Sequence, residues 1–405
     1  MSSVELMLFM QESNFTFLPN SDFCGPVLVN ISEIAEELLY NHIQIFFVTV
    51  ILPIILAFGL LGNVWFLFVI CRLRWMRTPL NCYLINLAIA DIFFLLFAGG
   101  EKLFQKMTSP VTNNAATMGT VGCVLIPVVT DCCYFASIFI VTLVSLKRFY
   151  AICRPLQQKR HGARHKSLRM VLIAWFGALA FSCLLIPGEC VLTTYCVEWP
   201  ATDYYKHFPT VIGYCIAMEP WLADLRNSVQ TVPFFVAMIL NAIFYGNIIM
   251  AVHSSATWSG GSSQSGGENR ARNLRNRHRV SRMLVINGVL FFLCLAPFEI
   301  TTFASMITGD NFEGSTMAKT WKEICYTLMY LNSAINPVIY NVAHPRYRHA
   351  FRLAFAGNWP WGKSQATTTS SLKRSRQLTP QRLNQELINP PEQLECYSAV
   401  KEEIE

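Results

Sequence analysis

Seven long apolar stretches constrain this 405-residue chain more than any other feature. A helix needs about 20 consecutive apolar residues to cross the hydrocarbon core of a membrane. Over the whole chain 53% of the residues are hydrophobic and 14% are charged, against roughly 25% charged residues in a soluble domain. The sequence therefore predicts an all-α membrane protein, a seven-transmembrane helix bundle. The stretches are residues 43–71, 81–104, 120–152, 170–187, 229–252, 280–307 and 320–342.

The charges between the stretches predict how the chain lies across the membrane. Basic residues gather in residues 72–77, 154–169 and 270–282, whereas residues 1–42 contain no Lys or Arg. Basic loops stay in the cytoplasm, so we expect a multi-pass plasma-membrane protein with its N-terminus outside and its C-terminus inside. The net charge of +7 comes from these short runs. Such runs set membrane topology, and no nucleic-acid partner is expected.

This pattern divides the chain into four regions. Residues 1–42 form an extracellular tail with sequons at Asn14 and Asn30, which we expect to be glycosylated. Residues 43–343 form the transmembrane domain. Residues 344–356 place Tyr347, Phe351 and Phe355 on one helical face, as in an eighth, amphipathic helix that lies on membrane lipids. Residues 357–405 are polar and are expected to be a disordered cytoplasmic tail.

The third stretch ends in SLKRFYAICRPL, residues 145–156. On their own, Lys147 and Arg148 would fit interface anchors, because long cationic side chains extend to the lipid headgroups. The whole run resembles the signature at the end of the third helix of rhodopsin-like (class A) G-protein-coupled receptors. The acidic residue of that signature is Lys147 here, and its Tyr is Phe149.

Further runs resemble the family's other helices in the same order. They are residues 62–64 (GNV), residues 86–91 (NLAIAD), Trp175, Tyr245, residues 291–297 (FFLCLAP) and residues 332–340 (NSAINPVIY). The resemblance covers about residues 43–355. It implies a receptor that binds an extracellular ligand and activates heterotrimeric G proteins. The Ser/Thr run at residues 367–371 is then an expected phosphorylation site for receptor kinases and arrestin, with a plain linker as the alternative. No motif of an enzyme is present.

Asp91 is a carboxylate inside an apolar stretch, where a central Asp costs about 2.5–3.5 kcal/mol on insertion scales. The resemblance implies that Asp91 and four polar neighbours line a small pocket for a sodium ion, since oxygen ligands suit a hard cation. A hydrogen-bonded network without an ion is the alternative, and no other cofactor or metal is expected. The neighbours are Ser137, Asn332, Ser333 and Asn336.

The resemblance also assigns residues to G-protein coupling. The family's acid before the Arg holds that Arg in the inactive state, so Lys147 predicts raised ligand-independent signalling. Leu295 stands where the family has Trp, which would act in the opposite direction. The assigned set is Lys147, Arg148, Phe149, Tyr245, Phe291, Leu295 and Tyr340.

Cysteines at the outer side imply a disulfide by the same resemblance. Cys123 opens the third stretch and Cys196 lies in the loop after the fourth, as in the family's bridge between these regions. A second bridge from Cys24 to Cys215 or Cys325 stays open.

The class of ligand is less constrained. Amine receptors of the family carry an Asp seven residues after the Cys that opens helix three, where this chain has Thr130. The signature run and the loop CVEWP look most like neuropeptide receptors. We therefore expect a peptide, with an amine or other small molecule, or an orphan receptor, as alternatives. Unpaired carboxylates in the outer third of the helices predict that the ligand carries a cationic group, unless they pair with Lys102 or with one another. The expected ligand-binding residues are Glu101, Thr130, Asp131, Phe298, Glu299 and Tyr330.

Overall fold

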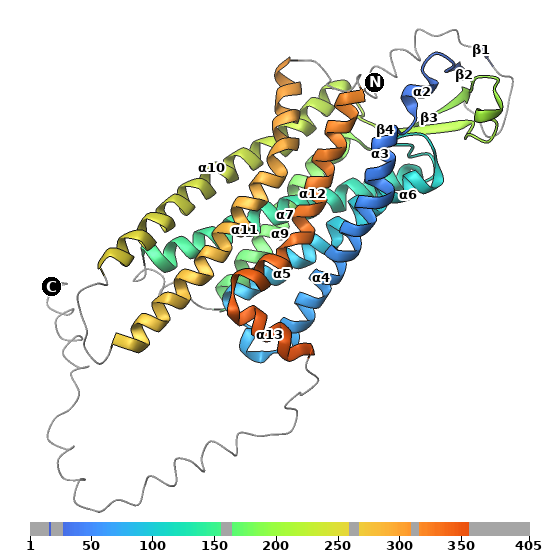
Figure 1. Ribbon diagram of the computed structural model, residues 1–405. Coiled ribbons are helices and arrows are strands. Elements are labelled where there is room, and N and C mark those ends of the chain that lie inside the picture. The colour runs from blue at the N-terminus through green and yellow to red at the C-terminus, as the bar shows by residue number, and fades with distance from the viewer. Residues whose placement is uncertain (1–15, 18–26, 155–163, 259–266, 309–315, 356–405) are drawn as a thin grey trace, which may run out of the picture. The chain divides into compact units, whose positions relative to one another are not determined.

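The computed structural model describes residues 16–17, 27–154, 164–258, 267–308 and 316–355. One compact unit ends at Arg352, and a second begins at Leu353. Within the described part of the first unit, seven long helical segments run side by side (Figure 1). The predicted all-α fold class is confirmed, with the addition of one small sheet.

The first two segments each contain a π-helical turn. Residues 42–72 comprise α3 (His42–Phe46), η1 (Phe47–Ile51) and α4 (Leu52–Arg72), and they start at a capping box formed by Asn41 and Gln44. Residues 79–108 comprise α5 (Pro79–Phe94), η3 (Leu95–Gly99) and α6 (Gly100–Thr108). A π turn accommodates one extra residue and rotates the helix beyond it, so η3 sets the direction of α6, the last part of the second segment.

The other five segments are single helices. They are α7 (Gly119–Cys153), α9 (Arg164–Leu185), α10 (Pro220–Trp258), α11 (Gly267–Thr308) and α12 (Thr316–Ala343). Helix α10 begins at Pro220, nine residues before the apolar stretch predicted from hydropathy. Pro fits the first turn of a helix because the N–H it lacks would have no intrahelical partner there. The short helical turns are α2 (Ala35–Leu38), η2 (Arg74–Met76), η4 (Ile186–Gly188) and η5 (Asp203–Tyr205).

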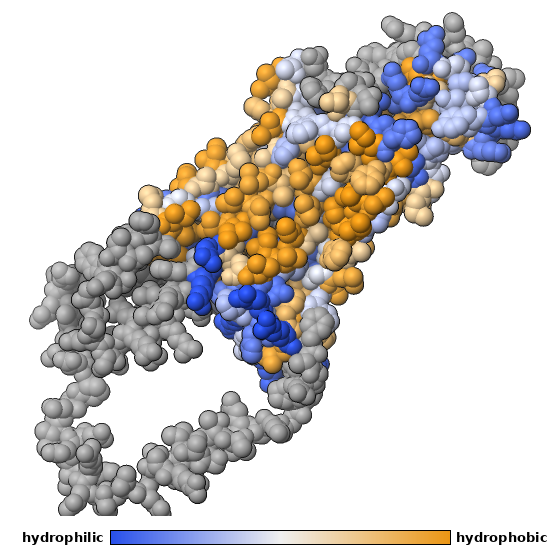
Figure 2. Space-filling view, viewed as in Figure 1, coloured by the Kyte–Doolittle hydropathy of each residue, from blue (hydrophilic) through white to orange (hydrophobic). Residues whose placement is uncertain are grey.

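Apolar side chains cover the middle of these helices on the face that Figure 2 shows, with polar side chains towards both ends. Large side chains such as Phe58, Leu61 and Phe176 are more than 70% exposed, which only a hydrocarbon surrounding makes favourable. Among the described residues, six segments are long and apolar enough to cross a membrane. Helix α12 is the seventh, and it carries Lys319, Lys322 and Glu323 near its first turns.

A four-stranded sheet covers one end of the bundle (Figure 1). Its strands are β1 (Thr16–Phe17), β2 (Val27–Asn30), β3 (Val191–Glu198) and β4 (Val211–Ile216), in that spatial order. Strands β3 and β4 form an antiparallel hairpin, and β2 from the N-terminal region joins β3 in parallel, with Leu28 opposite Cys196. The sheet has its own buried core, made of Val29, Ile31, Ile34, Leu38, Val111, Val197, Ile212 and Tyr214.

Helix α13 (Pro345–Phe355) follows α12 at the opposite end. Tyr347 anchors its start, because its hydroxyl donates a hydrogen bond of 2.6 Å to Asn81 Oδ1 and its ring lies 6.0 Å from that of Tyr340. The side chain of Arg346 lies over the Trp75 ring, 5.0 Å from its centre. The predicted eighth helix is present, and its placement on a membrane surface stays a prediction. Asn14 and the residue 367–371 run lie outside the described residues.

Candidate functional site

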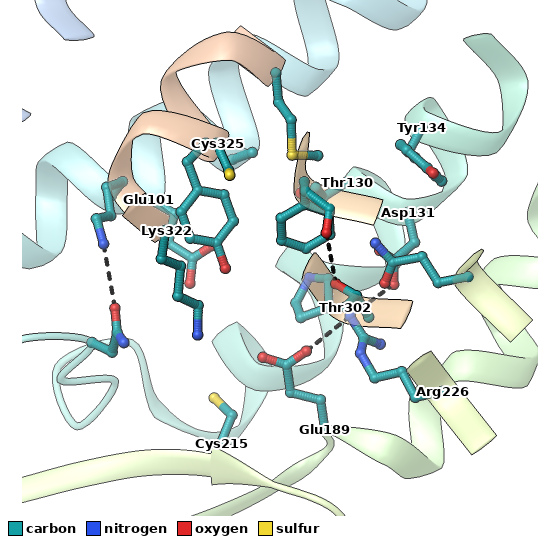
Figure 3. A pocket seen from close by; sticks show the side chains of 18 of the residues that line it. Glu101, Thr130, Asp131, Tyr134, Glu189, Cys215, Arg226, Thr302, Lys322 and Cys325 are labelled. Carbon is teal, nitrogen blue, oxygen red and sulfur yellow. Dashed lines mark hydrogen bonds and ion pairs between the residues drawn. The ribbon is translucent and has the colours of Figure 1, made fainter. Parts of the chain in front are cut away.

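A cavity of about 470 Å³ opens between the helices at the end of the bundle that the sheet covers. Side chains from α6, α7, α10, α11 and α12 line it, together with Tyr214 and Cys215 of β4 (Figure 3). Five of the six predicted ligand-binding residues meet at this cavity. They are Glu101, Thr130, Asp131, Phe298 and Tyr330.

Asp131 has a basic partner that sequence reasoning missed. Arg226 of α10 places Nη2 at 3.1 Å from Asp131 Oδ2 and at 2.9 Å from Glu189 Oε2, so one guanidinium joins two carboxylates (Figure 3). Gly188 makes room for this arrangement, because a β-carbon there would lie 2.7 Å from Arg226 Cβ. The only sequence signal was Pro220, which marks the early start of α10 and brings Arg226 onto a helix.

A second ion pair lies on the other side of the cavity. Lys102 Nζ is 3.4 Å from Glu323 Oε2 of α12, and both side chains are largely buried. Lys102 also donates to Asn113 Oδ1 at 3.4 Å. Glu101, its neighbour, accepts a hydrogen bond of 3.1 Å from Gln105 Nε2, one turn further along α6. Among the described residues lining the cavity, Glu101 is thus the carboxylate with no basic side chain within 4 Å.

Glu299, the sixth predicted residue, does not line the cavity. It is fully buried behind Tyr134, whose hydroxyl donates a hydrogen bond of 2.5 Å to Glu299 Oε1. Tyr134 and Gln230, two side chains that bond to Glu299, line the cavity in its place, so Glu299 acts on the site through them. Burial by a neighbouring helix cannot be read from the helical period alone, which explains why the sequence placed Glu299 at the ligand.

The predicted disulfide between Cys123 and Cys196 is wrong, since Cys123 bonds to Cys215 with a Cα–Cα distance of 5.5 Å. In the hairpin, Cys215 pairs with Leu192 and Cys196 with Val211, four residues further along. At about 3.4 Å per residue this separates the two cysteines by about 14 Å, too far for one to replace the other.

The hydrogen bonds of Gly213 hold β4 beside the start of α7. Its N–H donates to Asn114 Oδ1 at 3.0 Å and its carbonyl accepts from Ala115 N at 2.7 Å. The open alternatives for Cys24 also fail, because Cys215 is taken and Cys325 is a free thiol. Cys196 is itself disulfide-bonded.

The predicted polar cluster lies deeper in the bundle. Asp91 is 1% exposed, and its Oδ2 accepts a hydrogen bond of 2.7 Å from Asn336 Nδ2 of α12. Asn63 of α4 donates to the carbonyl of Ser333 at 2.9 Å. Asp91 Oδ1 and Asn63 Oδ1 are buried and have no hydrogen-bond partner in the described part of the chain. The other predicted members, Ser137 and Asn332, are also buried.

The predicted coupling residues lie deeper in the bundle and towards the end remote from the sheet. Lys147 and Arg148 are half-buried at the foot of α7, and the Phe149 ring lies 5.7 Å from that of Phe244. The Tyr340 ring lies 5.1 Å from that of Phe66. Phe291 and Leu295 are both buried in α11, and neither lines the cavity, while Tyr245 is bonded to Ser145 of α7.

Comparison with known proteins gives a consistent result. Residues 62–340 match the model of the 7 transmembrane receptor (rhodopsin family). The thyrotropin-releasing hormone receptor of Homo sapiens is 28% identical over 325 residues, which cover 75% of this chain and 77% of that protein. The neuromedin-U receptor 2 of Rattus norvegicus is 26% identical over 324 residues, which cover 78% and 76%. The chain is a multi-pass membrane protein and a non-enzymatic G-protein-coupled receptor, and it belongs to the rhodopsin family of seven-transmembrane receptors.

Proposed function

We propose that this receptor lies in the plasma membrane with its sheet outside, binds a peptide in the outer cavity and activates a heterotrimeric G protein at the inner end. The single observation that carries the proposal is the outer cavity with its two ion pairs. Its volume of about 470 Å³ is that of a site for a drug-sized ligand, so the end of a peptide fits. Both similar receptors are named for peptides, which supports the same ligand class.

The orientation is supported by the charges at the two ends. Arg72 ends α4, Lys147 lies in the last two turns of α7 and Arg279 lies in the first half of α11, all in the parts of these helices remote from the sheet. Basic residues favour the cytoplasmic side. The exposed Asn30 of β2, within its sequon, lies at the other end, where a glycan would be added.

The ligand carries a cationic group, and Glu101 receives it. Asp131 is already compensated by Arg226, and Glu299 lies behind Tyr134. Glu101 alone among the cavity's described carboxylates forms no ion pair within 4 Å; it accepts a hydrogen bond from Gln105, and the charge of the neighbouring Lys102 compensates it only from a greater distance. An uncompensated carboxylate in a partly buried site is costly, and a ligand cation removes that cost. The position where amine receptors of the family carry an Asp is Thr130 here, which also argues against an amine as the ligand.

A peptide screen tests the proposal. Thyrotropin-releasing hormone, neuromedin U and a library of basic neuropeptides would be applied to cells that express the receptor, with calcium and cyclic AMP as readouts. An active basic peptide would then be compared with an analogue whose cation is replaced by a neutral group of similar shape. We expect Glu101→Gln to lower the potency of the charged peptide at least tenfold, or about 1.4 kcal/mol, and to leave the neutral analogue unaffected.

Asp131→Asn serves as the matched control, because Arg226 already neutralises that carboxylate. Equal losses for the charged and neutral peptides in Glu101→Gln would show that Glu101 supports the fold rather than the ligand's cation. A silent screen at normal surface expression would count against the peptide as ligand.

We also infer that Asp91 holds a sodium ion. The observation that supports it is the pair of buried oxygens without partners, Asp91 Oδ1 and Asn63 Oδ1. Carboxylate and amide oxygens suit a hard cation, and buried polar atoms without partners are rare. Bound sodium would stabilise the receptor against heat, so replacing it with N-methylglucamine should lower the thermal midpoint of the wild type but not that of Asp91→Asn. The same midpoint for the wild type in both salts would leave only a hydrogen-bonded network.

A further inference from the structure

Tyr245 of α10 reaches two other helices at the inner half of the bundle. Its hydroxyl shares a hydrogen bond of 2.6 Å with Ser145 Oγ of α7, and both side chains are buried. The end of its ring lies against Gly288 of α11. A β-carbon on Gly288 would lie 2.5 Å from Tyr245 Cζ and closer still to the hydroxyl oxygen, and real β-carbons do not approach other atoms below 3.0 Å. The ring therefore occupies the space where a side chain at residue 288 would begin.

A glycine in the middle of a helix needs a local reason, because it is the poorest helix former after proline. At Gly288 the reason is the contact with Tyr245. Moving the ring away costs free energy, because the hydroxyls of Tyr245 and Ser145 are both buried and each would lose a hydrogen-bond partner. Three helices thus meet at one contact, α7 through Ser145, α10 through Tyr245 and α11 through Gly288.

We propose that Gly288 is a positioning residue that sets how often this receptor signals without ligand. Any side chain at this position must either displace Tyr245 from Ser145 or move the inner half of α11 away from α10. Either change loosens the three helices at the end where the G protein binds. The proposal rests on the proposed coupling to a G protein, so its test includes a measurement that does not depend on signalling.

The signalling test compares Gly288→Ala with Gly246→Ala. Gly246 follows Tyr245 on the same helix, and an added β-carbon there meets nothing within 4 Å. Both substitutions bring the same gain in helix propensity. They differ only in that the new β-carbon at residue 288 collides with Tyr245. At matched surface expression we expect Gly288→Ala to raise ligand-independent G-protein signalling several-fold and Gly246→Ala to leave it unchanged. Equal signalling by the two variants overturns the positioning role.

The second test follows thermal unfolding of the purified receptor. Gly288→Ala should lower the midpoint in the wild-type background. In a Tyr245→Ala background the same substitution should raise it, because the ring is absent and only the better helix propensity remains. If Gly288→Ala lowers the thermal midpoint equally in both backgrounds, its contact with Tyr245 is not the cause of the destabilisation. If no G protein responds to the wild type at all, the proposed function fails, whereas this reversal of sign still decides whether Gly288 positions Tyr245.

Discussion

Replacing Arg226 by Gln should destabilise the receptor more than any single change to the two carboxylates that Arg226 joins. Without the guanidinium, the carboxylates of Asp131 and Glu189 would face each other with no counter-charge. The side chain of Asp131 is 9% exposed and that of Glu189 is 39% exposed. Breaking a buried ion pair on one side costs about 3–5 kcal/mol. Because water screens Glu189, we expect the lower end of this range, about 3 kcal/mol.

Asp131→Asn should cost much less, about 1 kcal/mol, the usual net value of one hydrogen bond. Arg226 keeps Glu189 as a partner in that variant, so no buried charge is left alone. The double variant Arg226→Gln with Asp131→Asn should therefore be more stable than Arg226→Gln by itself. This reversal distinguishes a compensated charge from a side chain that merely fills space.

The assay is thermal unfolding of purified receptor in one detergent, read for the wild type, both single variants and the double variant. The expected order of midpoints is wild type, Asp131→Asn, the double variant and Arg226→Gln. If the double variant is the least stable of the four, the two losses add, and Arg226 does not act as the counter-ion of Asp131.

Three further outcomes are expected. Cys123→Ser and Cys215→Ser should lower surface expression equally, and mass spectrometry of a non-reduced digest should recover the two joined peptides, whereas any other partner for Cys123 contradicts the hairpin register. Lys147→Glu should lower ligand-independent signalling up to several-fold, since like-charge repulsion near the headgroups amounts to about 1 kcal/mol or less; an unchanged level would show that this charge does not set the resting state. Asn30→Gln should increase the electrophoretic mobility of the receptor, in the same direction as glycosidase treatment of the wild type. An unchanged mobility would mean that the exposed sequon carries no glycan.

Features that depend on a long local pattern were predictable from the sequence. A long apolar stretch must be removed from water whatever elements surround it, so the lengths of the stretches alone indicated membrane-spanning helices. The meeting of Asp91 and Asn336 was implied by motifs on two different stretches, and the hydrogen bond of 2.7 Å between them agrees with that resemblance.

Features that depend on register or on the neighbouring element were not predictable. Arg226 lies before the apolar stretch that begins at residue 229. It belongs to the first turns of the helix from Pro220, which hydropathy does not detect. The choice of Cys215 over Cys196 depends on which end of a hairpin approaches α7, and the two cysteines lie in similar sequence surroundings. The parallel strand β2 is too short for its alternation to stand out, and its partner β3 is far away in the chain.

That parallel strand also constrains the order in which the receptor matures. Strand β2 emerges from the ribosome before any transmembrane helix. Its antiparallel neighbour β1 precedes it in the chain, but its parallel neighbour β3, residues 191–198, follows only after four long helical segments. Pairings so distant in sequence form slowly, so we expect the pairing of β2 with β3 to form late. With the proposed orientation, the Asn30 sequon stays accessible to the glycosylation enzymes during that interval, and in the finished sheet its side chain is exposed. A sugar added there early would therefore not hinder the later pairing of β2 with β3.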